Sequence, residues 1–323
     1  MIKIALIGIG HVSNYQIDAI SHIDTLLLTD AYDIDIERAK NLPDSVQFHE
    51  SLQDLFNKSK ADVFLISTPN MTHFEIGMEA IERGRSVLLE KPICTSQKEL
   101  DTIIEASETS GAFTSVAFHA AFARDVDWWI NNCDNYELGR LRGFNAGFYD
   151  PYIANGVVSP MSKSLGGAWI DSGINALSVI SKFINPSKLR IDESRMTYLD
   201  GIDCQQVQGL TIFSFENTDN YGHGIIDTNW SLNVNRKTTR LWYENADILL
   251  HHSLESIYKL EGHKSTLIKD LRNDNERLTN HYISLFSQLA SDYMQGEANL
   301  KHAAVIHQLL FSAMGERDQY SVI

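Results

Sequence analysis

The stretch Ile2-Lys3-Ile4-Ala5-Leu6-Ile7-Gly8-Ile9-Gly10-His11-Val12-Ser13 decides the fold of the N-terminal part of the chain. Its mostly apolar run predicts a buried strand, which leads through two glycines into a segment with helical spacing. Gly8 permits a tight turn, and Gly10 lets the backbone approach a pyrophosphate resting on the N–H groups of the helix N-terminus. Because Ser13 replaces the third glycine or alanine of this fingerprint, an ordinary glycine turn is the alternative.

Outward from this turn, the first 120 residues alternate short apolar runs with longer segments whose apolar residues recur every three or four positions. Strands that alternate with helices and are apolar throughout predict a parallel sheet covered on both faces, the doubly wound Rossmann arrangement. The candidate strands are Ile2–Ile7, Leu26–Thr29, Val63–Ser67, Val87–Leu89 and Phe113–Ala117.

After about residue 120 the strand-like runs follow one another without regular helices between them. They predict a C-terminal α+β domain with a large, open, mostly antiparallel sheet. These runs are Leu141–Tyr149, Val207–Phe215, Gly224–Leu232, Thr239–Tyr243 and Ile248–His252, followed by helical patterns around Leu289 and Leu310. We therefore expect two domains, residues 1–120 and residues 121–323.

Composition and charge exclude several classes of protein. The 323 residues carry 27 Lys and Arg against 42 Asp and Glu, a formal net charge of −15 that disfavours nucleic acid and anionic membranes. No apolar run reaches the roughly 18 residues of a membrane span, and the N-terminus does not resemble a secretory signal. Cys94, Cys133 and Cys204 lie outside any C-x-x-C, and the histidines, His251-His252 included, lack ligand spacing. We expect a cytoplasmic protein without a bound metal.

The residues after the second strand indicate which dinucleotide is bound. In Thr29-Asp30-Ala31-Tyr32-Asp33, an acid lies about 20 residues beyond the glycines, where it accepts hydrogen bonds from the adenosine ribose and repels a 2′-phosphate. We choose Asp33, with Asp30 as the alternative, and predict NAD. Arg38 could still assist a phosphate, so NADP remains the alternative cofactor.

Two further motifs resemble one known family. The stretch Asp62-Val63-Phe64-Leu65-Ile66-Ser67-Thr68-Pro69-Asn70-Met71-Thr72-His73, followed by Val87-Leu88-Leu89-Glu90-Lys91-Pro92, is similar to the Gfo/Idh/MocA oxidoreductases (glucose-fructose oxidoreductase and inositol dehydrogenase). The resemblance implies a nicotinamide-binding Rossmann domain, a second domain for substrate binding and oligomerisation, and a homodimer or higher homo-oligomer. The predicted cofactor-binding residues are Gly8, Gly10, His11, Val12, Asp33, Thr68, Pro69, Asn70, His73, Glu90 and Lys91.

Lys91 is the first candidate for catalysis. By resemblance it is the lysine of the Glu-Lys-Pro motif, close to the nicotinamide and the reacting hydroxyl, whereas the alternative is a solvated surface lysine. Burial and the cationic nicotinamide ring would lower its pKa and make it a proton acceptor or donor. Glu90 is expected to anchor the turn, and a cis peptide bond at Pro92 is allowed because it precedes a proline.

A second group of residues lies in Gly166-Gly167-Ala168-Trp169-Ile170-Asp171-Ser172-Gly173-Ile174-Asn175. Asp171 and Asn175 are four apart and share one helix face. They resemble the family's Asp-x-Gly-x-His helix, with Asn175 at the position of the catalytic histidine. Asn cannot take a proton near neutral pH, so we predict catalysis by Lys91, Asp171 and Asn175 with Lys91 handling the proton.

The same helix and Phe118-His119-Ala120-Ala121-Phe122 resemble the aldose 1-dehydrogenase branch, which acts on galactose or arabinose. We predict substrate binding by His119, Asp150, Tyr152 and Trp169; plain strand-end and helix-start roles are the alternative.

The leading hypothesis is an NAD(P)-dependent dehydrogenase or reductase that transfers a hydride between nicotinamide and a sugar or polyol hydroxyl, including aldose C1. The alternative is a non-catalytic sensor of dinucleotide or sugar on the same fold. Lys91 and Asp171 favour the enzyme.

Overall fold

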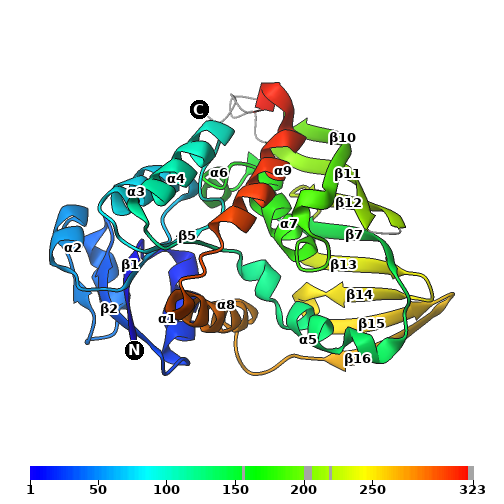
Figure 1. The fold of residues 1–323 in the computed structure, drawn as a ribbon, viewed down its shortest axis with the longest axis horizontal. Helices are drawn as coiled ribbons and strands as arrows, with labels where there is room; N and C mark the ends of the chain where they lie inside the picture. Colours follow the sequence, from blue (N-terminus) through cyan, green and yellow to red (C-terminus); the bar gives the residue numbers. More distant parts are fainter. Residues whose placement is uncertain (155–156, 200–205, 218–219, 319–323) are drawn as a thin grey trace. The chain divides into compact units, whose positions relative to one another are not determined.

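The computed structural model describes residues 1–154, 157–199, 206–217 and 220–318, so Cys204 lies outside the described residues. The chain forms two compact units (Figure 1). The first unit comprises Met1–Phe118 and Leu278–Ala304, and the second unit comprises His119–Arg277 and Val305–Ile323.

The first unit contains a parallel sheet with the strand order β3-β2-β1-β4-β5-β6. This is the Rossmann order, in which β1 and β4 meet where the direction of strand addition reverses, so the predicted fold class is confirmed. The strands are β1 (Ile2–Ile7), β2 (Leu26–Tyr32), β3 (Gln47–Phe48), β4 (Val63–Ile66), β5 (Val87–Glu90) and β6 (Thr114–Ala117). The helices are α1 (His11–Ser21), α2 (Leu52–Lys58), α3 (Asn70–Glu82), α4 (Gln97–Ser110) and α8 (Arg277–Gln295), with the 3-10 turn η1 (Ile36–Asn41).

Local chemistry explains where these elements begin and end. Every residue of β4, β5 and β6 is buried, as expected for strands covered on both faces. Helix α4 begins after Ser96, whose side chain accepts a hydrogen bond from Glu99 N, and it ends at Gly111, whose φ of 67° is left-handed.

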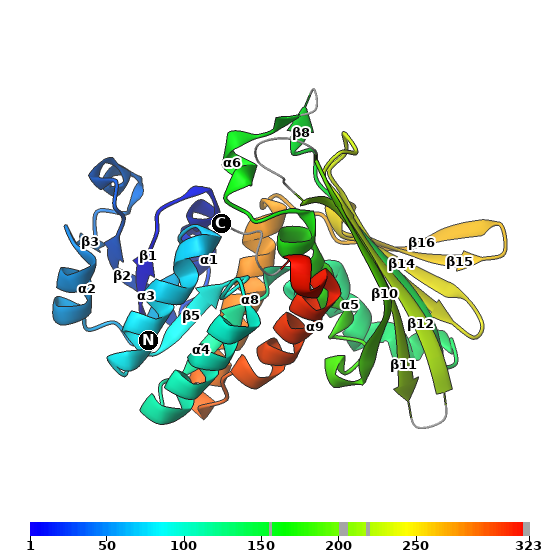
Figure 2. The same ribbon diagram turned by 90° about the horizontal axis from the view of Figure 1, so that it is seen from above.

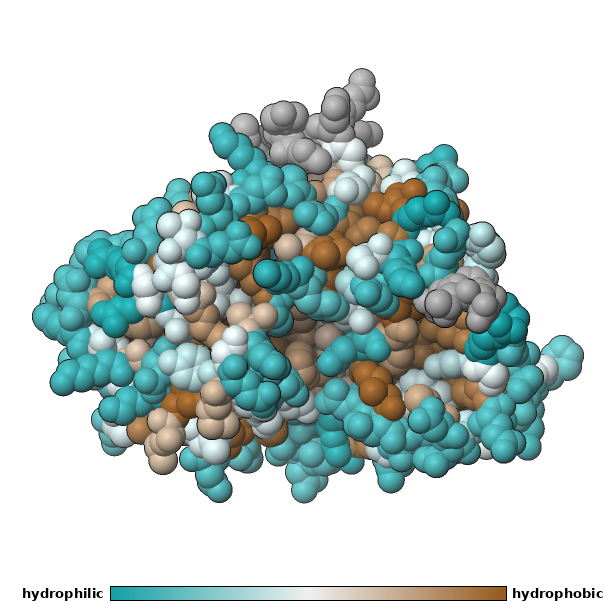
Figure 3. All heavy atoms as spheres, in the orientation of Figure 1, coloured by the Kyte–Doolittle hydropathy of each residue, from teal (hydrophilic) through white to brown (hydrophobic). Residues whose placement is uncertain are grey.

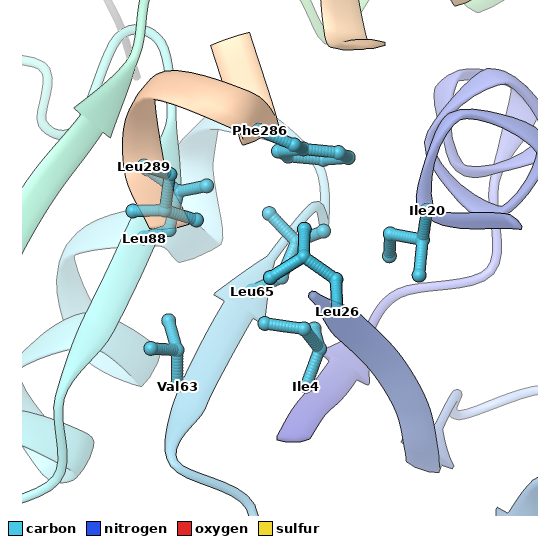
Figure 4. Close-up of a pocket in the computed structure, with 8 residues that line it drawn as sticks. All are labelled: Ile4, Ile20, Leu26, Val63, Leu65, Leu88, Phe286 and Leu289. Atoms are coloured by element: carbon cyan, nitrogen blue, oxygen red, sulfur yellow. The ribbon is translucent and has the colours of Figure 1, made fainter. Parts of the chain in front are cut away.

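Helix α8 covers one face of the first sheet although it comes from the far end of the chain. In Figure 4, Phe286 and Leu289 of α8 and Ile20 of α1 point toward the strands. The facing side chains are Ile4, Leu26, Val63, Leu65 and Leu88. This space is lined only by carbon and has no room for a water molecule, so we interpret it as packed core.

The second unit contains an eight-stranded sheet with the order β10-β11-β12-β7-β13-β14-β15-β16. Its neighbours are antiparallel except for the parallel pair β12 and β7, which confirms the predicted mostly antiparallel sheet. Its strands are β7 (Leu141–Tyr149), β10 (Leu189–Tyr198), β11 (Gln206–Asn217), β12 (Asn220–Asn229), β13 (Arg236–Tyr243), β14 (Asp247–His251), β15 (Ser256–Glu261) and β16 (Lys264–Asp270). A small ribbon pairs β8 (Ile153–Ala154) with β9 (Val157–Val158).

Helices cover one face of this sheet, which we call the inner face. The π-helical turn η4 (Trp169–Gly173) and helix α7 (Ile174–Ile180) pack on β7, and η4 also packs on β11 and β12. Helix α5 (Arg124–Asn132) packs on β14 and β15, and Figure 2 shows it on one side of the sheet. The remaining elements are α6 (Pro160–Lys163), α9 (Leu300–Asp318), and the turns η2 (His119–Phe122), η3 (Cys133–Tyr136), η5 (Pro186–Lys188) and η6 (His252–Leu254).

Strands β10 and β16 escaped prediction because their sequences are polar. Most residues of both strands are at least partly exposed, and both lie at the edges of the sheet. A strand with few buried residues lacks the apolar run by which strands are recognised.

Hydrophilic side chains dominate the face shown in Figure 3, in keeping with the formal net charge of −15. Among the described residues, none of the helices combines the length and apolar character needed to span a membrane.

We expect Phe286→Ala to destabilise the first unit by about 3–5 kcal/mol, because Phe286 is 1% exposed against the sheet. Native-state hydrogen exchange of the β4 amides would measure this loss. Met294→Ala is the control, since Met294 is 70% exposed on the same helix. Equal losses in the two variants would contradict the packing described for α8.

Candidate active site

The turn between β1 and α1 leaves the start of the helix accessible. Gly8 has a φ of 94°, and a Cβ at this position would lie 2.7 Å from Ser67 O, so no other residue fits without strain. A Cβ at Gly10 would meet nothing within 4 Å. No described side chain caps α1, and its first turn, which begins with His11 and Val12, is free of acidic residues. The turn therefore fits a pyrophosphate bound by backbone N–H groups.

Asp33 binds this turn directly. Its Oδ2 accepts a hydrogen bond from Ile9 N at 2.6 Å, and its Oδ1 accepts one from Asp35 N at 2.9 Å. A carboxylate has lone pairs left for ribose hydroxyls after two such bonds. The alternative acid, Asp30, is buried, and its Oδ1 lies 2.7 Å from His49 Nε2. Its carboxylate therefore already has a hydrogen-bond partner inside the unit.

His73 connects the turns that follow β4 and β5. Its Nε2 lies 2.7 Å from Thr68 O and its Nδ1 lies 2.7 Å from Pro92 O. Burial lowers the pKa of His73 below its usual 6.5, while the two carbonyl oxygens oppose that shift. Thr68, Pro69 and Asn70 form the junction of β4 and α3, with Pro69 as the residue that precedes the helix. The two motif turns are therefore fixed to each other.

Glu90, the last residue of β5, is a buried centre of hydrogen bonds. Its Oε1 accepts from Tyr282 Oη at 2.5 Å and from Gln16 Nε2 at 2.9 Å, and its Oε2 accepts from Lys91 N at 3.2 Å. Burial nevertheless raises the pKa of Glu90, and these donors oppose that shift. The carboxyl group thus ties α1 and α8 to the strand end that carries Lys91.

The Lys91–Pro92 peptide bond is cis, as the sequence allows, and Lys91 is partly exposed. The first unit therefore brings the glycine turn, Asp33, His73, Glu90 and Lys91 to the carboxyl ends of its strands, where open α/β sheets bind their ligands.

In the second unit, Asp171 lies in the π-helical turn η4 and Asn175 lies at the start of α7. Both side chains are buried, and Asn175 Nδ2 donates to Asp171 O at 3.1 Å. Within the described residues, Asn175 Oδ1 has no hydrogen-bond partner. A buried acceptor without a donor costs stability unless something else supplies one, and π-helical turns are frequent at functional sites. This oxygen is therefore a candidate acceptor for a substrate hydroxyl.

Asp150 follows β7 and is held by two side chains from other elements. Its Oδ1 accepts from Lys237 Nζ of β13 at 2.5 Å, and its Oδ2 accepts from Ser172 Oγ of η4 at 3.0 Å. Burial lowers the pKa of the Lys237 ammonium, whereas the charges of Asp150 and Asp171 oppose that shift.

Tyr152 lies beside the same carboxylates. Burial, followed by the charges of Asp150 and Asp171, raises the pKa of its hydroxyl far above the usual range, and its ring lies edge-on to Trp230 at 5.2 Å. The second unit thus brings together Asp150, Tyr152 and Asp171. Trp169 does not join them, because it is fully buried and its indole N–H donates to Leu310 O at 2.9 Å. His119 begins the turn η2 and is partly exposed.

Lys237 and Ser172 were not identified from the sequence. The alternation of strand residues could have indicated Lys237, because side chains two residues apart in a strand point to the same face of the sheet. Thr239 and Leu241 are buried, and one further step of two residues places Lys237 on their face. No group of three or more metal-ligating side chains occurs among the residues that the structure describes.

The fold and site define a dinucleotide-binding Rossmann unit joined to a unit with an extended mixed sheet. Residues 2–118 match the profile of the Gfo/Idh/MocA oxidoreductase family with an NAD-binding Rossmann fold. This match over the first unit's N-terminal segment confirms the predicted resemblance to the family.

The chain is similar to scyllo-inositol 2-dehydrogenase (NADP(+)) IolU of Bacillus subtilis, with 24% identity over 184 residues. The match covers 54% of this chain and 56% of IolU, so the chain spans about half the length of that relative. The structure of the present chain resembles that of a 3-ketoreductase from Actinomadura kijaniata in complex with NADP. The TM-score is 0.79 and the identity 14%, and the match covers 96% of this chain and 95% of that chain. An oxidoreductase from Agrobacterium radiobacter in complex with NAD+, L-tartaric acid and magnesium is also similar, with a TM-score of 0.76, 14% identity and 96% coverage of both chains. These two structures show a shared fold.

We expect Glu90→Gln to change how stability depends on pH. Because the pKa of Glu90 is raised above its usual 4.5, the stability it contributes is fully present below that pH and is lost as the pH rises through the folded-state value. Calorimetric unfolding between about pH 5 and about pH 8 should therefore show the Tm of Glu90→Gln rising relative to the unaltered protein. Glu82→Gln, an exposed change in the same unit, is the control. A Tm difference independent of pH would contradict the raised pKa of the buried Glu90.

Proposed function

We propose that this chain is an NAD(P)-dependent oxidoreductase that transfers a hydride between nicotinamide and a sugar or polyol carbon bearing a hydroxyl. The observation that carries the proposal is the accessible helix start at Gly10 beside Asp33, in a unit whose strand ends also hold Lys91. The name of IolU, a dehydrogenase of scyllo-inositol, supports the choice of substrate class.

In the first unit, Gly8 and Gly10 would hold the pyrophosphate and Asp33 the adenosine ribose. The bound nicotinamide supplies the acceptor or donor of the hydride. Lys91 Nζ takes the hydroxyl proton during oxidation and returns it during reduction. Glu90 and His73 hold the backbone on either side of Lys91 through Lys91 N and Pro92 O.

In the second unit, Asp171, Tyr152 and the free acceptor of Asn175 bind substrate hydroxyls. An amide cannot exchange a proton near neutral pH, which supports Lys91 as the residue that handles it. Several hydroxyl-binding groups in one unit suit a substrate with several hydroxyls, such as a cyclitol or a pyranose, and we include oxidation at the anomeric carbon of an aldose.

No observation favours the non-catalytic sensor. The described cysteines, Cys94 and Cys133, are free thiols, which supports a reducing cytoplasm as the location. Association into a homodimer or higher oligomer remains part of the proposal, and light scattering would test it.

We expect Lys91→Met to remove most turnover, by roughly 100-fold or more, because general acid–base catalysis contributes about that much. NADH formation with a panel of aldoses and cyclitols measures turnover, and calorimetric titration with NAD+ measures binding. Binding should remain within about twofold, because the pyrophosphate and ribose contacts do not involve this side chain. Lys98→Met, an exposed lysine in α4, is the control. Near-native turnover of Lys91→Met would overturn its role.

We expect Asp33→Asn to raise the ratio of kcat/KM for NADP to that for NAD roughly 10-fold, equivalent to about 1.4 kcal/mol. Asn keeps an acceptor for Ile9 N but removes the charge that repels a 2′-phosphate. Arg38, which donates to Ile9 O at 3.2 Å, is close enough to the turn to receive that phosphate. The control is Asp24→Asn, an exposed acid in the same unit. Equal use of both cofactors by the unaltered protein would count against Asp33.

A further inference from the structure

The buried ion pair of Asp150 and Lys237 lies next to the proposed substrate-binding residues of the second unit. Asp150 is 5% exposed, and the Lys237 side chain is 13% exposed. Lys237 pairs with Phe148 across the sheet, so its side chain emerges on the inner face beside a buried aromatic ring. Burying two charges costs several kcal/mol per ion unless both are fully paired, so such a pair needs a reason other than stability.

The ammonium of Lys237 has all three of its protons directed at protein oxygens. Nζ lies 2.5 Å from Asp150 Oδ1, 2.7 Å from Asn235 Oδ1 and 3.5 Å from Tyr149 O. An ammonium has three donors and no acceptor. Lys237 is therefore arranged to hold protein groups rather than to bind an anionic ligand.

Asp150 transmits this interaction to the π-helical turn. Its second oxygen accepts from Ser172 Oγ, and Ser172 is the residue next to Asp171. The backbone of Asp150 is itself fixed, because Asp150 N donates to Asn229 O at 3.1 Å and Tyr152 N donates to Asp150 O at 3.0 Å. The positive charge of Arg277, like burial, lowers the pKa of Lys237. Without the ammonium, Asp150 would be a buried carboxylate whose side-chain oxygens keep only the hydrogen bond from Ser172 Oγ, which leaves its charge uncompensated.

We infer that Lys237 is a positioning residue for the substrate site: it holds the Asp150 carboxylate in place, and Asp150 through Ser172 fixes the π-helical turn that presents Asp171 and Asn175. The expected effect of Lys237 on kcat/KM rests on the proposed function. The coupling of Lys237 to the turn is a property of the second unit alone.

The coupling can be tested without any activity, because all five tryptophans, Trp128, Trp129, Trp169, Trp230 and Trp242, lie in the second unit. Urea unfolding followed by tryptophan fluorescence should show a lower midpoint for Lys237→Met. Asp150→Asn, added to Lys237→Met, should restore most of the loss, because it removes the uncompensated charge. Lys269→Met, an exposed lysine of β16, is the control and should leave the midpoint unchanged. An unchanged midpoint for Lys237→Met would overturn the coupling.

Positioning of the turn is read by hydrogen exchange of the peptide that contains residues 169–180. In the stable double variant Lys237→Met/Asp150→Asn, this peptide should exchange faster than in the unaltered protein, and Ser172→Ala should act in the same direction. Lys237→Arg, which keeps the charge, should restore slow exchange in part. Unchanged exchange in the double variant would reduce the pair to a structural role and overturn the inference.

Kinetics with a substrate identified under the proposed function complete the test. The double variant should lower kcat/KM for the sugar or polyol by roughly 10- to 100-fold, since displacement of aligned groups by about an ångström has that effect. The KM for NAD should stay within about twofold. Wild-type kinetics in the double variant would overturn the inference. Absence of any activity in the unaltered protein would instead contradict the proposed function, while exchange and unfolding still decide the role of Lys237.

Discussion

The buried carboxyl group of Glu90 is the interaction on which the first unit depends. Three segments far apart in the chain meet at it: α1 through Gln16, α8 through Tyr282 and the strand end through Lys91 N. A buried carboxyl group without donors would cost several kcal/mol, so each of these segments is held where it satisfies the group. The glycine turn before α1 and the lysine after β5 are thereby positioned by the same few atoms.

The second unit also contains a buried carboxylate, and there a charged side chain binds it. Asp150 is satisfied by an ammonium and a hydroxyl, whereas Glu90 is satisfied by neutral donors. Burial raises the pKa of Glu90, and its hydrogen-bond donors together with the charge of Lys91 oppose that shift without cancelling it. In the second unit the positive charge of Lys237 lies directly against the carboxylate of Asp150. Burial, followed by the charges of Asp150 and Asp171, raises the pKa of the nearby Tyr152.

Much of the first unit was predictable because its signals are local. Gly8 is required by a positive φ at a fixed position, and a strand buried on both faces is an uninterrupted apolar run. The pair Asp171 and Asn175 was predictable in part: their spacing of four indicated a shared face, but the π-helical turn that surrounds Asp171 has no sequence signal that we recognised. The exposed edge strands β10 and β16 were missed because burial, which makes a strand recognisable, is small there.

The sequence by itself determined the strand and turn that open the Rossmann unit, the acid that follows β2 and the lysine that follows β5, since each depends on neighbours within a few residues. Tertiary structure alone decided that Tyr282 reaches Glu90 and that Lys237 reaches Asp150, pairs separated by 192 and 87 positions in the chain. A tyrosine in an amphipathic helix or a lysine in a strand is compatible with many surroundings. The packed sheet and helices bury these carboxylates, and a buried carboxylate without donors has a high free energy. The fold therefore requires a donor from a distant segment at each of them.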